Sequence, residues 1–237
     1  MKNITELISS NVSTVDIANT VPAVCISGGI DSTVILHHVI QSFGPDVYTF
    51  TATFGNDKDE TEKAQRVADY YGTHHIEVSV SKPRMLSMFK YALSYYPFPR
   101  FNLWPWLVIE SLHANKIVNL FIGEGGDELF GYPDRSFLEG WAGQLDWVWP
   151  AWKGACDHYG ISLHAPFKEI QKESSPVIEF YLPPNKELLR EAYKGILPDF
   201  VIGQESTPPS HGFYKMMGMT KKELQIEVCK IWLRQNT

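Results

Sequence analysis

The chain has 237 residues, 44% of them hydrophobic and 20% charged, which is enough for one sizeable core and predicts a single domain over residues 1–237. Its formal net charge of −6 argues against a binder of polymeric nucleic acid, because nonspecific affinity for nucleic acid comes mostly from clustered Lys and Arg. The N-terminus has no signal-peptide pattern, no apolar run could span a bilayer, and the three cysteines lie far apart in sequence. We therefore expect a reduced, cytoplasmic protein with no membrane partner.

The first strand signal leads directly into a glycine-rich turn. Residues 21–26 are apolar and partly β-branched, as in a strand buried in a parallel sheet, and residues 33–40 carry the apolar set of a helix that packs on it. The turn between them, residues 27–33, reads Ser-Gly-Gly-Ile-Asp-Ser-Thr. By itself this is also the composition of a tight turn with a helix cap. Adjacent glycines before a helix N-terminus nevertheless suit a phosphate-binding loop, and Asp31 fits beside phosphate when Mg²⁺ lies between them.

The following segments alternate between strand and helix signals. This alternation predicts an α/β fold with a parallel β-sheet flanked by helices, followed by a helical C-terminal part. Strands are expected at residues 47–54, 73–80 and 117–122. A first helix is expected within residues 1–20, and a later one is expected to end near residue 71. Further helices are expected at residues 82–95, 106–115, around 178–181, at 187–193 and from about residue 221. A tryptophan-rich run contains Trp141, Trp147, Trp149 and Trp152, and aromatic clusters of this kind lie in a core or an interface more often than they form a stacking platform.

A second glycine-rich segment follows the strand expected at residues 117–122. Residues 123–132 read Gly-Glu-Gly-Gly-Asp-Glu-Leu-Phe-Gly-Tyr and lie at the carboxyl end of that strand, where open α/β sheets bind ligands. Its three carboxylates, Glu124, Asp127 and Glu128, repel one another unless a cation or a cationic substrate lies among them. The segment is therefore a second candidate ligand-binding loop.

Together the two loops resemble those of the synthetase domain of asparagine synthetase and its relatives, including β-lactam synthetases and lasso-peptide cyclases, within the N-type ATP pyrophosphatases (PP-loop superfamily). The resemblance implies an adenine nucleotide alpha hydrolase-like fold and the use of ATP with Mg²⁺. In that family ATP activates a carboxylate as an acyl-adenylate and releases pyrophosphate. An amine or ammonia then attacks the acyl carbon.

The resemblance also implies a role for individual residues. Asp31 and Asp127 would hold Mg²⁺, and Glu124 would orient the substrate or assist the incoming amine as a base. The residues that would hold the pyrophosphate are Ser27, Gly28, Gly29, Ser32 and Thr33. The backbone that would cradle the adenosine and the α-phosphate lies near Cys25, Ala52, Ile122 and Gly123.

The chain departs from the family at the catalytic lysine. An ungapped count places Ser206 where the family has this lysine. We expect Lys215 to replace it in space as the catalytic cation, because the prolines and the glycine in residues 208–212 allow the intervening loop to fold back. Lys186 and Arg190 are the alternatives.

The predicted function is that of an AMP-forming ligase that adenylates a small-molecule carboxylate and forms an amide. Residues 102–106, Asn-Leu-Trp-Pro-Trp, are bulkier than the family's residues on the substrate side, so aspartate is not the expected substrate. No glutaminase segment precedes the first loop, and the nitrogen is expected from free ammonia, an amine substrate or a separate glutaminase subunit. Two alternatives stay open: a PP-loop enzyme that modifies a nucleobase or nucleotide, and a noncatalytic nucleotide-binding relative.

Overall fold

The structure, a computed structural model, describes residues 4–55, 59–130, 149–174, 186–204 and 210–236. Trp141, Trp147, Ser206 and the helix expected around residues 178–181 lie outside the described residues. Across the described ranges, no helix combines the length and hydropathy that crossing a membrane requires.

A five-stranded, all-parallel sheet forms the centre of the fold, with the strand order β3-β2-β1-β4-β5. The predicted α/β fold class is therefore confirmed. The strands are β1 (Ala23–Cys25), β2 (Tyr48–Phe54), β3 (His74–Val80), β4 (Asn119–Ile122) and β5 (Ser162–His164). The pattern of hydrophobic residues predicted the first four within two residues, whereas β5 is three residues long and was not predicted.

The strand order creates a switch point between β1 and β4. The chain runs outward from β1 through β2 to β3 and then returns to place β4 on the other side of β1. β1 and β4 are paired in parallel, with Cys25 opposite Ile122, so the carboxyl ends of both strands lie side by side. Open α/β sheets bind ligands at this kind of crevice. The two glycine-rich segments, which follow these two strands, therefore emerge next to each other.

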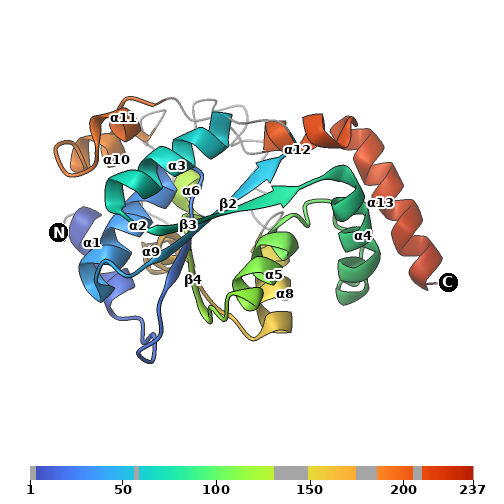
Figure 1. The fold of residues 1–237 in the computed structure, drawn as a ribbon, viewed down its shortest axis with the longest axis horizontal. Coiled ribbons are helices and arrows are strands. Elements are labelled where there is room, and N and C mark those ends of the chain that lie inside the picture. The colour runs from blue at the N-terminus through green and yellow to red at the C-terminus, as the bar shows by residue number, and fades with distance from the viewer. Residues whose placement is uncertain (1–3, 56–58, 131–148, 175–185, 205–209, 237) are drawn as a thin grey trace.

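One face of the sheet is covered by α1, α2, α3 and α9 (Figure 1). Their bounds are Ile4–Ser13, Ile30–Phe43, Asp59–Tyr71 and Pro166–Ser174, and the shorter helices α6 (Gly126–Phe130), α10 (Glu187–Ala192) and α11 (Asp199–Ile202) join the same side. α2 begins three residues before its predicted start because Gly29 serves as its N-cap. Ile30, Val34, Ile35 and Val39 of α2 are buried in this core.

The opposite face is covered by α4, α5, α8, α12 and α13. Their bounds are Lys82–Ala92, Pro105–Ala114, Trp149–Tyr159, Ser210–Met217 and Lys221–Asn236. The helix predicted at residues 82–95 is divided into α4 and a 3₁₀ turn, η1 (Leu93–Tyr95). Trp106 is fully buried here and donates its indole N–H to the hydroxyl of Tyr96 (2.9 Å). Trp152 is also buried in this core, as the composition of the tryptophan-rich run indicated.

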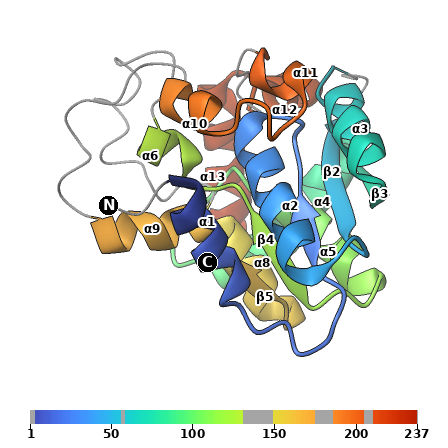
Figure 2. The ribbon, with the colours of Figure 1, turned by 90° about the vertical axis from the view of Figure 1, so that its left-hand side faces the viewer.

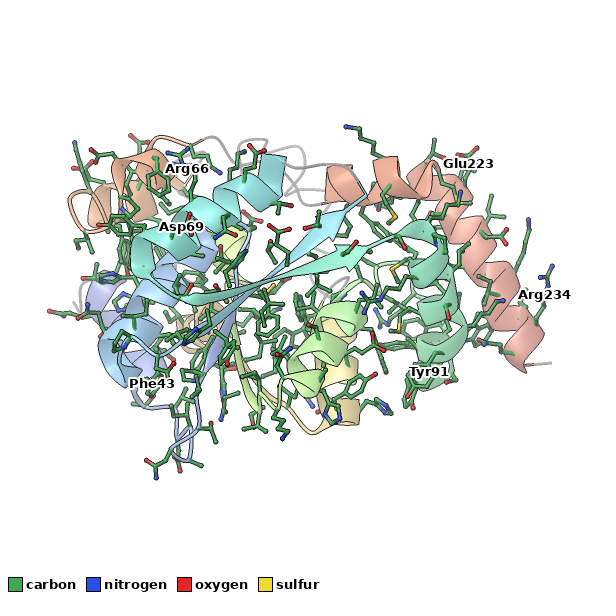
Figure 3. All side chains as sticks on the ribbon, viewed as in Figure 1. Phe43, Arg66, Asp69, Tyr91, Glu223 and Arg234 are labelled. Atoms are coloured by element: carbon green, nitrogen blue, oxygen red, sulfur yellow. The ribbon has the colours of Figure 1, made fainter. Side chains whose placement is uncertain are left out.

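The C-terminal helices lie along one end of the molecule. α10, α11 and α12 run across the top in both views (Figures 1 and 2), and the carboxyl end of β2 points toward α12. α11 is attached to α3 by a cation–π contact, in which the Arg66 guanidinium lies 4.4 Å from the centroid of the Phe200 ring. Figure 3 shows Arg66 reaching from α3 toward this part of the chain. Helices α10, α11 and α12 thus lie at the end of the molecule toward which the carboxyl end of β2 points.

Candidate active site

The first loop joins β1 to α2 and is held in shape by its own hydroxyl groups. The backbone N–H of Ser27 donates to Ser32 Oγ (3.2 Å), which in turn donates to the carbonyl oxygen of Gly29 (3.2 Å). Thr33 is fully buried and donates its hydroxyl to the same carbonyl oxygen (2.8 Å), so it supports the loop from within the fold. Ser27 is exposed, and the first N–H groups of an α-helix lack intrahelical partners. This end of α2 is therefore suited to receive an anion.

Gly28 allows α3 to pack closely against this loop. Its φ is +77°, in the left-handed region that favours glycine. A Cβ at this position would lie 2.6 Å from the backbone carbonyl carbon of Lys63 and 2.7 Å from the backbone nitrogen of Ala64, both on α3. Any larger residue would have to displace either the loop or the helix.

The second loop packs directly on the first turn of α2. A Cβ at Gly123 would lie 2.9 Å from the backbone nitrogen of Ser32, and one at Gly126 would lie 2.6 Å from Cγ of Asp31. Residues 126–130, part of the predicted second loop, form the short helix α6. The two segments are thus brought together at the switch point, and glycine makes their close approach possible.

Asp31 and Asp127 converge on the ammonium group of Lys186. Lys186 Nζ donates a hydrogen bond to Asp31 Oδ2 and lies 2.7 Å from Asp127 Oδ1. Only 5% of the Lys186 side chain is exposed, against 18% for Asp31 and 33% for Asp127. Lys186 immediately precedes α10 and has a φ of +60°, a conformation that is rare for a long side chain and is concentrated at functional sites.

Burial and mutual attraction shift the pKa values of this cluster. Burial raises the pKa of the Asp31 carboxyl to about 6, and the neighbouring Asp127 carboxylate adds to the shift while the Lys186 ammonium opposes it. Burial acts to lower the pKa of Lys186, but the two carboxylates outweigh burial and raise it above its ordinary value. The cluster at neutral pH therefore contains a protonated lysine between two carboxylates.

The donor atoms of this cluster fit a hard divalent cation. Oδ1 of Asp31 is buried and has no hydrogen-bond partner among the described residues, so one carboxylate oxygen is still available as a ligand. The described ranges contain no group of three or more His, Cys, Asp and Glu side chains that could hold a metal ion. Mg²⁺ is commonly held by one or two carboxylates, with water and substrate phosphates as its other ligands. Asp31 and Asp127 suit that arrangement.

The residues expected to cradle adenosine lie at the carboxyl ends of three adjacent strands. Cys25 ends β1, Ile122 ends β4, and Ala52 lies near the end of β2. Ala52 and Ile122 are buried, and burial with the nearby Glu124 charge raises the pKa of the Cys25 thiol to about 12. The thiol is therefore protonated and unreactive at neutral pH. Contact between the backbone of these three strand ends and a nucleotide stays a prediction.

The structure separates the two lysines considered for the catalytic cation. Lys215 lies on an exposed surface of α12, whereas Lys186 lies between the two carboxylates at the loops. Lys186 was expected only as an alternative to Lys215, from its place just before the helix predicted at residues 187–193. The role predicted for Lys215 stays a prediction.

Arg190 is a second residue whose place only the structure reveals. From α10 its guanidinium donates hydrogen bonds to the carbonyl oxygens of Ile202 and Gln204, the latter at 2.7 Å. These carbonyls lie at the C-terminal end of α11, where backbone acceptors lack helical partners and favour a cation. Arg190 thereby connects the helix that follows Lys186 to the chain that leads toward residue 206.

Comparisons with known proteins agree with the two loops. The family model of asparagine synthase matches residues 4–177. A curated relative, amidase chry2 of Gibberella zeae, is 31% identical over 147 residues, which are 54% of this chain and 22% of that protein, so the chain spans about a fifth of the relative's length.

Two solved structures share a more distant likeness. NMN synthetase from Francisella tularensis superposes with a TM-score of 0.41 at 13% identity, over 98% of this chain and 92% of that one. NH3-dependent NAD synthetase from Campylobacter jejuni, in complex with the nitrate ion, has a TM-score of 0.34 at 12% identity, over 82% of this chain and 96% of that one.

Proposed function

The chain belongs to the asparagine synthase family, and from this premise we propose that it is an ATP-dependent ligase that converts a carboxylate into an amide with release of AMP and pyrophosphate. The observation that carries the proposal is the convergence of Asp31, Asp127 and Lys186 beside the N-terminus of α2. Two acidic groups and one ammonium at a helix N-terminus suit a Mg²⁺-bound polyphosphate. We propose that residues 1–237 act as one synthetase domain.

The proposed reaction has two steps. In the first, an oxygen of the substrate carboxylate attacks the α-phosphorus of ATP, the bond from that phosphorus to the bridging β-oxygen breaks, and pyrophosphate leaves. In the second, ammonia or an amine attacks the acyl carbon, the bond from that carbon to the AMP oxygen breaks, and Glu124 accepts a proton from the nitrogen. The nitrogen is supplied as free ammonia, as an amine substrate or by a separate glutaminase subunit.

This chain's residues would contribute mainly by positioning and by electrostatics. The first loop, with Ser27, Gly28, Gly29, Ser32 and Thr33, would hold the pyrophosphate. Mg²⁺ held by Asp31 and Asp127 would neutralise charge on the leaving group. Lys186, fixed between these carboxylates, would add an ammonium group to the same region. The backbone at Cys25, Ala52, Ile122 and Gly123 would bind adenosine and the α-phosphate.

The nucleotide product tests the proposal. The protein is incubated with Mg·ATP, ammonium or hydroxylamine, and a panel of carboxylic acids, and the nucleotides are separated by anion exchange. We expect AMP and pyrophosphate in equal amounts, formed only when an acid is present, and their loss in the Asp127→Asn variant. ADP as the main product would contradict the proposed chemistry. Tight binding of Mg·ATP without any turnover would favour the noncatalytic alternative.

A further inference from the structure

Five aromatic residues form an aromatic wall on one side of the carboxyl edge of the sheet: Phe54, Trp104, Trp149, Trp152 and Phe213. The ring centroids of Phe54 and Phe213 are 5.7 Å apart, those of Phe54 and Trp104 are 5.7 Å apart, and those of Trp104 and Trp152 are 5.2 Å apart. Each of these pairs packs edge to face, a favourable geometry for aromatic rings. Trp149 precedes Trp152 by three residues on α8, so the two side chains lie on the same side of that helix.

The connectivity of the fold places this wall next to the proposed active site. Phe54 is the last residue of β2, Trp104 is the N-cap of α5, and Trp149 is the first residue of α8. α5 and α8 lead into the parallel strands β4 and β5, so both helices begin at the carboxyl edge of the sheet, where the glycine-rich loops also lie.

The wall is not entirely enclosed by the core. Phe54, Trp152 and Phe213 are buried, whereas Trp104 and Trp149 are only half-buried. Two indole rings that are held in place by buried neighbours therefore present part of their flat apolar surface at this edge. Rigid, partly exposed aromatic rings are typical anchors for flat apolar ligands.

Lys168 lies between the aromatic wall and the second loop. A Cβ at Gly125 would lie 3.0 Å from Cγ of Lys168, so the lysine stem passes directly against the residue that follows Glu124. Lys168 Nζ lies 5.0 Å from the centroid of the Trp149 ring, a cation–π contact. Lys168 is half-buried, with its stem against the second loop and its ammonium group over the Trp149 ring.

We propose that the aromatic wall and Lys168 form the subsite for the acyl substrate, and that this substrate is a carboxylic acid with a planar apolar ring. Trp104 and Trp149 would contact the ring, and Lys168 would pair with the carboxylate beside Glu124. A second carboxylate, as in aspartate, would lose its hydration against the apolar indole rings, which is unfavourable. This inference deepens the proposed function and rests on it.

Three small ligands separate the contributions of the ring and the charge. The intact protein, with Mg²⁺ and an ATP analogue that has a methylene group between the α and β phosphorus atoms, is titrated calorimetrically with phenylacetate, acetate and benzyl alcohol. We expect phenylacetate to bind about tenfold or more tightly than acetate, which lacks the ring, and than benzyl alcohol, which lacks the charge. Aspartate is expected to bind no better than acetate.

Matched variants assign the effect to residues. Trp104→Ala and Lys168→Met should each weaken phenylacetate binding about tenfold, while Trp104→Phe, which keeps a flat ring, should stay within about threefold of the parent. Lys153→Met is the control for Lys168→Met, because it removes an exposed lysine of α8 that is paired with Asp157. Lys153→Met should leave the affinity for phenylacetate unchanged. Equal binding of all three ligands, or unchanged phenylacetate binding in both Trp104→Ala and Lys168→Met, would overturn the inference.

The outcomes also separate this inference from the proposed function. If phenylacetate binds as expected but no acid yields AMP, the subsite stands and the ligase activity fails. If AMP forms with aspartate and phenylacetate does not bind, the ligase activity stands and the aromatic subsite is wrong.

Discussion

At the scale of single residues, the site is defined by charges that could not be buried separately. The carboxylates of Asp31 on α2 and Asp127 on α6 would repel each other, and the ammonium group of Lys186 compensates the charge of both. Removing one member of a buried ionic cluster leaves an uncompensated charge, which typically costs about 3–5 kcal/mol. Lys186 therefore stabilises the folded site and at the same time supplies a positive charge next to the proposed pyrophosphate position.

Replacing either lysine by methionine distinguishes Lys186 from Lys215 as the catalytic cation. If Lys186 stabilises charge that develops in the reaction, Lys186→Met should lower the rate of pyrophosphate formation by about 10²-fold or more, while Lys186→Arg should retain part of the activity. Lys215→Met would then leave the rate nearly unchanged. Steady-state rates measured with thermal unfolding curves separate lost catalysis from lost folding. A large loss in Lys215→Met, with an active Lys186→Met, would restore Lys215 as the catalytic cation.

At the scale of elements, the geometry of the two loops depends on how closely helices approach them. α3 contacts the first loop at Gly28, and α6 contacts the first turn of α2 through Gly126. In both places the missing side chain sets the distance between two elements. At Gly28, the glycine that lets α3 approach also gives the first loop its left-handed backbone conformation.

Gly28→Ala should destabilise the protein more than an alanine at another glycine of similar backbone conformation. Gly72 has a φ of +66° and open space where a Cβ would be. Gly72→Ala should therefore lower the free energy of unfolding only by the roughly 1–2 kcal/mol that a non-glycine residue costs in the left-handed region. Gly28→Ala adds a clash with the α3 backbone and should cost about 1–3 kcal/mol more. Urea unfolding without nucleotide measures both. Equal losses would show that close packing is not what requires glycine at residue 28.

At the scale of the whole molecule, a buried histidine links the N-terminal half to the C-terminal helices. His38 on α2 shares a hydrogen bond of 2.6 Å with the hydroxyl of Tyr193, the C-cap residue of α10, 155 residues away. Burial lowers the pKa of His38 to about 4, and the neighbouring His37 contributes to the shift. The link therefore holds α10, and with it the segment that begins at Lys186, while His38 is neutral.

This shift predicts an acid-dependent loss of stability. A histidine whose pKa is lower in the folded state than its ordinary value near 6.5 contributes stability above pH 6.5, which is lost as the pH falls toward about 4. At 1.36 kcal/mol per pKa unit the loss is at most about 3 kcal/mol. Urea unfolding at pH 7 and pH 4.5 should show a larger loss in the parent than in His38→Gln, which stays neutral. An identical loss in both proteins would refute this role of His38.

The sequence by itself determined the features that local patterns encode. Apolar and β-branched residues predicted β1, β2, β3 and β4 within two residues, because a strand pattern is visible in a short window of residues. The two glycine-rich segments marked both candidate loops, since the structure shows close approaches at Gly28, Gly123 and Gly126. The parallel sheet followed from the alternation of strand and helix signals. The meeting of the two loops was also predictable, because parallel strands place their carboxyl ends at the same edge of the sheet.

Only the tertiary structure decided which distant side chains share the site. β5 has three residues and α6 five, too few to produce a periodic pattern, and both form because their neighbours supply the hydrogen bonds and the packing. Lys186 is 155 residues from Asp31, and Lys168 on α9 contacts the ring of Trp149 on a different helix, α8. The positions of such groups depend on the folded path of the whole chain. Their long-range electrostatic and aromatic contacts leave no local pattern in the sequence.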